Sequence, residues 1–236
     1  LNGEAQTITF SYKDQETPVI EQTATFENER QKVEISVVKQ DADTEKAVAG
    51  AEFGLYAKND MEAHGTVIVK ADNLLGKAVS GEDGKAVFTQ DLPFGEYYIK
   101  ELAAPDGYVS SDEVLEVKAE YQGQNIKVVQ LSSVFKNQPT KVVVSKSDLT
   151  TGVELSGATL TVLDKDGNVV DTWKSVKGEQ HLIERLTVGE TYTLREEMAP
   201  YGYLKAEEIT FTLEDTGEIQ KVEMKDDVPT GTIIIN

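Results

Sequence analysis

The chain has 236 residues, of which 39% are hydrophobic and 28% charged, a balance typical of a protein that buries apolar cores. At roughly 100 to 200 residues per domain, this length predicts one large domain or two of ordinary size. The formal net charge of −19 repels phosphate backbones and anionic lipid headgroups, so we expect neither nucleic-acid binding nor membrane contact. With no cysteine and only 2 histidines, a Cys/His metal site is excluded, and we expect no metal and no cofactor.

No apolar run approaches the roughly 20 residues that span a bilayer, and the chain begins with Leu1 rather than with a signal peptide. We therefore interpret it as a piece of a longer protein. Along the whole chain, short runs rich in Val, Ile, Thr, Tyr and Phe alternate with polar residues and are interrupted by Gly, Asp and Asn. This period of two predicts β-strands throughout and few helices.

Two Asp-Gly pairs, in residues 82–85 and 165–168, lie between alternating runs. They predict tight hairpin turns, because glycine accepts a positive φ angle. Residues 164–167 also resemble the start of a calcium loop. They lack the later ligands and the closing glutamate of an EF-hand, so we interpret them as a turn.

The chain contains an internal repeat, which is the first feature to seek before a fold is assigned. From Lys39 to Glu101 the first copy runs 62 residues, whereas the second runs 50 from Lys146 to Glu196. The first copy therefore carries about 12 extra residues, which we place within an insertion near residues 58–84. The corresponding segments are 37–41 with 144–148, 49–53 with 156–160, and 97–108 with 192–203.

The ends of the chain repeat as well. Residues 26–32 resemble residues 135–141, and an Asn is followed by a Lys four residues later in both. Residues 230–236 read as the first strand of a further copy. We expect C-terminal strands of a truncated preceding module at 1–31, complete modules at 32–139 and 140–229, and the start of a following module at 230–236.

Strand parity directs unusual polar residues into the core, because residues two apart on a strand point to the same face. Each copy contains three polar residues that share parity with apolar neighbours. They are a lysine of the first strand, a glutamate of the repeated twelve-residue segment, and an amide or carboxylate of the last strand. The predicted sets are Lys39, Glu101 and Asn137 in the first module and Lys146, Glu196 and Asp226 in the second.

A buried, unpaired lysine or glutamate costs several kcal/mol, so these sets require an explanation. The residues could be solvated, with the parity due to chance, although buried Lys and Glu are rare and the pattern occurs in both modules. The carboxylates could instead serve as an acid and base pair of a glycan-active enzyme, but a filled sandwich core leaves no substrate cleft.

The third interpretation is covalent. Desolvation lowers the pKa of a lysine and raises that of a glutamate, which provides a neutral amine nucleophile and a protonated acid. Lys39 would attack the side-chain amide of Asn137 and release ammonia, and Lys146 would attack the carboxyl group of Asp226 and release water. Reactants held at contact distance gain effective molarities of about 10⁵ M or more, enough for a reaction that occurs once per chain.

The chain resembles the SpaA-like, collagen-adhesin B-type (prealbumin-like) modules of Gram-positive pilins and surface adhesins. The most specific element is the E box of that family, Tyr-x-Leu-x-Glu-Thr-x-Ala-Pro-x-Gly-Tyr, which residues 97–108 and 192–203 match. Leu102 and Glu197 replace the Thr of the motif, and Ile99 replaces its Leu.

In that family the E-box glutamate catalyses an isopeptide bond between a first-strand Lys and a last-strand Asn or Asp. The resemblance implies these roles for the two sets above, with Glu101 and Glu196 as proton shuttles. Asp227 is adjacent to Asp226, and parity favours Asp226 as the second partner. Asn28 occupies the matching place in the truncated first module, where its partners are absent.

The resemblance also implies a fold and a function. We expect an all-β chain of tandem immunoglobulin-like β-sandwich modules, each of about seven strands. We expect a structural stalk segment of a cell-wall-anchored adhesin or pilin on the extracellular surface of a Gram-positive bacterium, in contact with neighbouring modules of the same chain. Its isopeptide bonds would replace disulfides, and its only catalysis would be their single-turnover formation.

The alternative is a ligand-binding adhesin module that recognises a host extracellular matrix protein or a glycan through its loops or the 58–84 insert. Residues 228–231, Val-Pro-Thr-Gly, resemble the sortase signal Leu-Pro-x-Thr-Gly but lack its spacer residue, so we interpret them as a linker.

Overall fold

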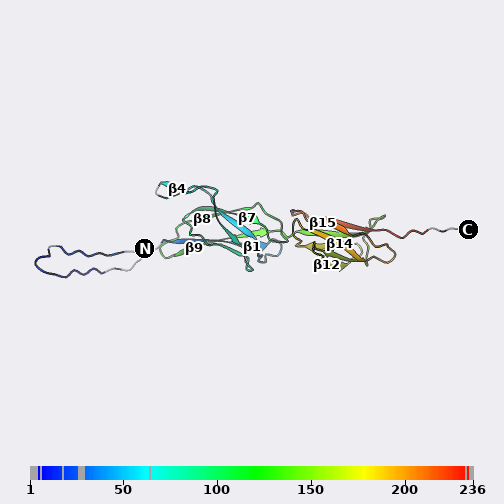
Figure 1. Ribbon diagram of the computed structural model, residues 1–236, viewed down its shortest axis with the longest axis horizontal. Helices are drawn as coiled ribbons and strands as arrows, with labels where there is room; N and C mark the ends of the chain where they lie inside the picture. The colour runs from blue at the N-terminus through cyan, green and yellow to red at the C-terminus, as the bar shows by residue number, and fades with distance from the viewer. Residues whose placement is uncertain are drawn as a thin grey trace.

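The computed structural model describes residues 5, 7–17, 19–25, 30–63, 65–231 and 233. Strands β1 to β16 and no helix occur in these residues, which confirms the predicted all-β class. Figure 1 shows two β-sandwich modules lying end to end, the first carrying β1, β7, β8 and β9 and the second β12, β14 and β15. Within the described ranges, no helix is long and apolar enough to cross a membrane.

The first module consists of a three-stranded sheet in the order β6-β1-β9 and a four-stranded sheet in the order β5-β2-β7-β8. The strands of the first sheet are β6 (Lys85–Phe88), β1 (Lys32–Asp41) and β9 (Val128–Asn137). Those of the second sheet are β5 (Leu74–Val79), β2 (Glu52–Ala57), β7 (Gly95–Ala103) and β8 (Val114–Ala119).

The second module repeats this topology with sheets in the orders β13-β10-β16 and β12-β11-β14-β15. The three-stranded sheet contains β13 (His181–Glu184), β10 (Lys141–Asp148) and β16 (Gln220–Asp226). The four-stranded sheet contains β12 (Val169–Lys174), β11 (Thr159–Leu163), β14 (Thr191–Met198) and β15 (Ile209–Thr212).

In both modules the first strand pairs in parallel with the last. Asp41 of β1 lies opposite Asn137 of β9, and Asp148 of β10 lies opposite Asp226 of β16. A parallel pair needs a long crossover connection, here the rest of the module. The two ends of each sandwich are therefore neighbours in one sheet, although they lie far apart in the sequence.

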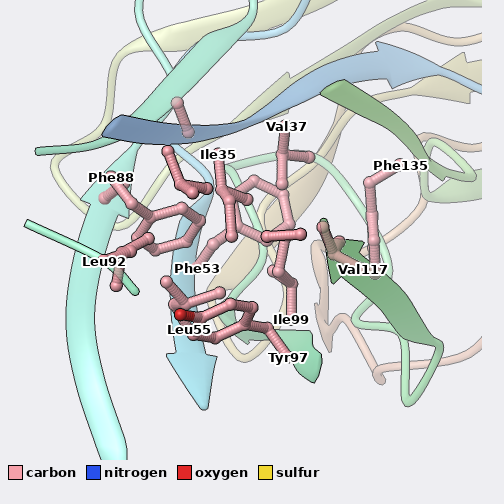
Figure 2. Close-up of a cluster of buried hydrophobic side chains, with 14 of the residues drawn as sticks. Ile35, Val37, Phe53, Leu55, Phe88, Leu92, Tyr97, Ile99, Val117 and Phe135 are labelled. Carbon is pink, nitrogen blue, oxygen red and sulfur yellow. The ribbon is translucent and has the colours of Figure 1, made fainter. Parts of the chain in front are cut away.

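Alternating apolar residues of the two sheets fill each interior. Figure 2 shows Ile35 and Val37 of β1 pointing toward Phe53 and Ile99 of the facing sheet, and all four side chains are fully buried. Phe53 also meets Phe135 of β9 edge to face, with ring centroids 5.2 Å apart. The second core is built in the same way from a separate cluster that includes Val144, Leu160, Leu194 and Met224.

The two predicted turns differ in what they connect. Residues 164–168 close a true hairpin, because β11 and β12 pair antiparallel on either side, and Gly167 adopts a φ of +82°. Gly84 also adopts a positive φ of +75°, but the strands on either side of it, β5 and β6, belong to different sheets. The prediction of a hairpin at 82–85 is therefore wrong. An Asp-Gly pair favours a tight turn but does not decide which strands pair.

The first module carries a hairpin that the second lacks. Strands β3 (Met61–Ala63) and β4 (Thr66–Val69) form a separate two-stranded sheet within the region predicted to hold an insertion. Asp60 supports its base by accepting hydrogen bonds from the backbone of Ala71 and from Lys70 Nζ. In Figure 1, β4 projects from the side of the sandwich.

No strand is assigned among the described residues that precede Lys32, or at residues 230, 231 and 233. The expected strands of neighbouring modules stay predictions, and Asn28 lies outside the described residues.

Candidate crosslinking centres

The first module positions Lys39, Glu101 and Asn137 from three different strands. Lys39 lies near the end of β1, Asn137 is the last residue of β9 beside it, and Glu101 extends from β7 of the facing sheet. Lys39 is fully buried, Asn137 is 2% exposed and Glu101 is partly buried. The odd-numbered residues of β1 face the core, so Lys39 is carried inward with Ile35 and Val37.

Glu101 contacts the amide nitrogen of Asn137. Asn137 Nδ2 donates to Glu101 Oε2 at 2.7 Å and to the carbonyl oxygen of Val109 at 2.7 Å. The backbone N–H of Ser111 donates to the same Glu101 oxygen at 3.2 Å. Lys39 Nζ donates to the carbonyl oxygen of Gln40 at 3.2 Å and interacts electrostatically with Glu101. The glutamate therefore lies beside the nitrogen that would leave in an amide exchange.

Burial brings the proton affinities of the lysine and the glutamate closer together. It lowers the pKa of Lys39 to about 8, against the opposing effect of the Glu101 and Asp41 carboxylates. It also raises the pKa of Glu101, against the hydrogen bond from Asn137 and the charge of Lys39. Each charged form is poorly solvated in the core, which favours a neutral amine beside a protonated acid.

The second module brings Lys146, Glu196 and Asp226 into direct contact. Lys146 Nζ lies 3.0 Å from Glu196 Oε1 and donates a hydrogen bond to Asp226 Oδ1. These three residues, from β10, β14 and β16, are at most 2% exposed. The backbone N–H of Ala206 donates to Glu196 Oε2 at 2.7 Å, as Ser111 does to Glu101 in the first module.

The structure separates Asp226 from Asp227. Asp226 is 1% exposed and contacts the lysine, whereas Asp227 is exposed and its carbonyl oxygen accepts a hydrogen bond from the backbone of Leu204. Burial raises the pKa of Asp226; Lys146 opposes this effect, and Glu196 adds to it. One buried lysine cannot compensate two buried carboxylates, so a proton is favoured on one of them.

The glutamates of the two centres contact different nitrogen atoms. In the first module Glu101 accepts a hydrogen bond from the side-chain nitrogen of Asn137, and in the second Glu196 lies 3.0 Å from the side-chain nitrogen of Lys146. A group that receives a proton from the amine and delivers one to the leaving group must reach both places. No group of three or more His, Cys, Asp or Glu residues able to hold a metal ion occurs among the residues that the structure describes.

Sequence reasoning missed an aspartate and a tyrosine beside each centre. Tyr108 Oη donates to Asp41 Oδ2 at 2.9 Å, and Tyr203 Oη donates to Asp148 Oδ2 at 3.0 Å. Lys39 Nζ also lies 5.2 Å from the centroid of the Tyr108 ring. The available signal was position: each aspartate follows its lysine by two residues, and each tyrosine ends the repeated twelve-residue segment.

Several solved structures are similar to the chain to different degrees. The C-terminal fragment of the pilus adhesin SpaC from Lactobacillus rhamnosus GG has a TM-score of 0.51 and 16% identity, and the match covers 86% of this chain and all of that one. The Bacillus anthracis TIE protein has a TM-score of 0.49 and 23% identity, with 84% of this chain covered. This chain spans about a third of the length of that protein, 34%.

The minor pilin GBS52 of Streptococcus agalactiae matches with a TM-score of 0.35 and 19% identity over 86% of this chain and 99% of that one. A search of curated proteins found no match. The family model described as SpaA, prealbumin-like fold domain, matches residues 33–132 and 140–228, one stretch for each sandwich. The chain therefore belongs to the SpaA family of prealbumin-like fold domains.

Proposed function

We propose that the chain is a structural stalk segment of a pilin or cell-wall-anchored adhesin on the extracellular surface of a Gram-positive bacterium. We further propose that each module is stabilised by a self-formed isopeptide bond. One observation carries this proposal: in each module a buried lysine of the first strand, a buried amide or carboxyl group of the last strand, and a glutamate of the facing sheet converge.

In the first module, the neutral amine of Lys39 attacks the side-chain carbonyl carbon of Asn137. The new C–N bond forms as the bond to Nδ2 breaks, and Nδ2 leaves as ammonia. Glu101 donates its proton to Nδ2, which it already contacts at 2.7 Å, and accepts one from the attacking amine. The product is a secondary amide without charge, so the cost of burying an ammonium and a carboxylate disappears.

In the second module, the nucleophile is Lys146 and the electrophile is the protonated carboxyl group of Asp226. The new C–N bond forms as the C–OH bond of this carboxyl breaks; Glu196 gives a proton to the departing hydroxyl group, which leaves as water, and accepts one from the attacking amine. The contacts of Lys146 Nζ with Glu196 and Asp226 already place the nucleophile and the acid at one point. Proximity supplies most of the rate, as in other intramolecular reactions.

The position of the bonds suits a load-bearing stalk. A force applied to the ends of the first module would pass along β1 only as far as Lys39, cross the amide bond, and leave the module through Asn137. Residues 40–136 would then lie outside the force path. Because β1 and β9 are parallel neighbours, an uncrosslinked module would instead bear the load through their hydrogen bonds. An amide, unlike a disulfide, also resists reduction.

The test is the intact mass of the denatured full chain, beside Glu101→Gln and Glu196→Gln variants. Formation of both bonds removes about 17 Da as ammonia and about 18 Da as water. We expect a deficit of about 35 Da for the native chain, and one missing step in each variant. A mass equal to that of the sequence would overturn the proposal.

A ligand-binding role is the alternative, and the projecting β3–β4 hairpin is the observation that favours it. The hairpin exposes Ile68, which is 58% accessible, and has no counterpart in the second module. Surface binding of the full chain to immobilised host matrix proteins and glycans tests this role. Saturable binding that is lost when residues 59–72 are deleted would support the adhesin; no binding with both crosslinks present would support the stalk.

A further inference from the structure

The second module reaches into the first through Arg185. This residue follows β13 and adopts a φ of +63°. Its Nη2 donates to Asp41 Oδ2 at 2.9 Å, and its Nε donates to Tyr108 Oη at 3.4 Å. Asp41 is 1% exposed, so this ion pair is largely shielded from water on the aspartate side. Arg185 thus caps the Asp41–Tyr108 pair that lies beside Lys39.

Backbone contacts across the joint fix the position of Arg185. Its N–H donates to the carbonyl oxygen of Thr140 at 3.0 Å, while the N–H of Thr140 donates to the carbonyl oxygen of Gly107 at 3.0 Å. Thr140 Oγ1 donates to the carbonyl oxygen of Leu186 at 2.6 Å. At Gly107, a Cβ atom would lie 2.8 Å from the carbonyl oxygen of Arg185, so this close approach requires glycine. The joint is therefore a built contact between modules.

A second charged residue of the second module, Asp215, approaches Glu101. Asp215 accepts hydrogen bonds from the backbone N–H of Ser110, at 3.0 Å, and from the Ser110 hydroxyl. The next residue, Ser111, donates its N–H to Glu101. The negative charge of Asp215 adds to the effect of burial in raising the pKa of Glu101.

We propose that the second module completes the crosslinking centre of the first, with Arg185 and Asp215 as positioning residues for the reaction of Lys39 with Asn137. This inference rests on the proposed function. Arg185 compensates the Asp41 carboxylate, which would otherwise stabilise the ammonium form of Lys39. Asp215 disfavours the carboxylate form of Glu101. Both charges favour the neutral amine and the protonated acid that the reaction requires.

The charges that face the centre act in opposing directions. Lys39 interacts with Glu101 from β7 and with Asp41 on its own strand, and both carboxylates favour its charged form. Burial disfavours ionisation of Asp41, but hydrogen bonds from Arg185, the Thr44 backbone and Tyr108 hold its pKa well below the usual range. Asp41 therefore stays ionised, and its charge needs a partner other than Lys39.

The second module provides an internal comparison. Its equivalent pair, Asp148 and Tyr203, has the same hydrogen bond, and Asp148 also accepts hydrogen bonds from Thr150 and Thr151. Among the described residues, no lysine or arginine forms an ion pair with Asp148. Within the described residues the centre at Lys146 therefore has no cation at this place, and its reaction should not depend on the joint between these two modules.

The reactive form, neutral Lys39 with protonated Glu101, has the same number of protons as the ion pair. Its population is therefore constant at pH values between the pKa of Glu101 and the pKa of Lys39, and it decreases below and above this range. Loss of Arg185 should raise the pKa of Lys39, which lowers the plateau rate and moves the basic limb to higher pH. Loss of the Asp215 charge should lower the pKa of Glu101, which lowers the plateau and moves the acidic limb to lower pH.

The experiment follows both bonds during folding of the full chain. Protein recovered unfolded and uncrosslinked from inclusion bodies is diluted out of denaturant at a series of pH values and quenched in acid. Digestion and mass spectrometry then report each bond separately. We expect Arg185→Ala and Asp215→Asn to slow the first bond about threefold to tenfold, because the reactive population changes tenfold per pKa unit, and to leave the second unchanged. Arg185→Lys should restore part of the rate.

Two features keep the result interpretable. Asp215→Asn removes a charge but changes the shape of the side chain little. A shift of the acidic limb in the pH profile of this variant would therefore not arise from a loosened joint alone. Equal rates and pH profiles of the first bond in all variants, with both bonds formed, would overturn this inference and leave the proposed function intact. Absence of both bonds in the native chain would overturn the proposed function and this inference with it.

Discussion

Substitution of Glu101 by glutamine removes the acid of the first centre and should leave Lys39 and Asn137 unlinked. The bond between them closes a segment of 98 residues, the difference of 137 and 39. Treated like a disulfide that constrains the unfolded chain, such a link contributes about 4.7 kcal/mol to the free energy of unfolding. At about 4 °C per kcal/mol for a domain of this size, the melting temperature should fall by about 20 °C.

Calorimetry of the full chain measures this effect, with the intact mass determined on the same sample. The two modules have separate cores, so the transition of the first should move while that of the second stays in place. Glu196→Gln is the matched experiment, with a segment of 80 residues between 146 and 226 and an expected loss of about 4.5 kcal/mol. Glu113→Gln, on an exposed residue, controls for the change of charge.

Two results would refute this reasoning. A Glu101→Gln chain that still loses the mass of two bonds would show that the glutamate is not required. A chain that lacks the first bond yet melts at the native temperature would show that the crosslink does not constrain the unfolded state as calculated.

Two further predictions concern the surroundings of Lys39. Burial lowers the pKa of Lys39 to about 8 even against the charge of Glu101, and in the uncrosslinked Glu101→Gln chain that opposing charge is gone. The unfolded state of this variant therefore binds more protons than the folded state at least between pH 8 and 10.5, and the free energy of unfolding, measured by denaturant titration, should rise with pH by about 3 kcal/mol or more across this window. A flat profile would contradict the burial of the Lys39 amine. Gly84→Ala would place a Cβ atom 2.5 Å from the carbonyl oxygen of Lys39 at a φ of +75°, whereas a Cβ at Gly167, with a φ of +82°, meets nothing within 4 Å. Gly84→Ala should therefore lower the melting temperature of its module more than Gly167→Ala lowers that of the other, and equal losses would show that backbone strain alone accounts for both.

Much of the fold could be predicted from the sequence because local patterns determine it. The period of two identifies strands, and parity alone turns Lys39 and Lys146 inward. The repeat indicates two similar sandwiches. The pairing of strands was harder to predict from local patterns, since the turn at Gly84 joins strands of two different sheets rather than two paired strands.

The joint between the modules could not be predicted, because it depends on contacts between distant surfaces. The first module has no arginine at the place that matches Arg185. When Pro93 is aligned with Thr187, the residue two positions earlier is Asp91 in the first module and Arg185 in the second. Its partner Asp41 reads as an ordinary strand end. Only the packing of the second module on Tyr108 brings these charges together.

The most direct test of the central claim is to locate the two bonds by proteolytic digestion and tandem mass spectrometry of the native chain. The account predicts two branched peptides, one that joins Lys39 to Asn137 and one that joins Lys146 to Asp226. Linear peptides carrying free Lys39 and Lys146 side chains would contradict it.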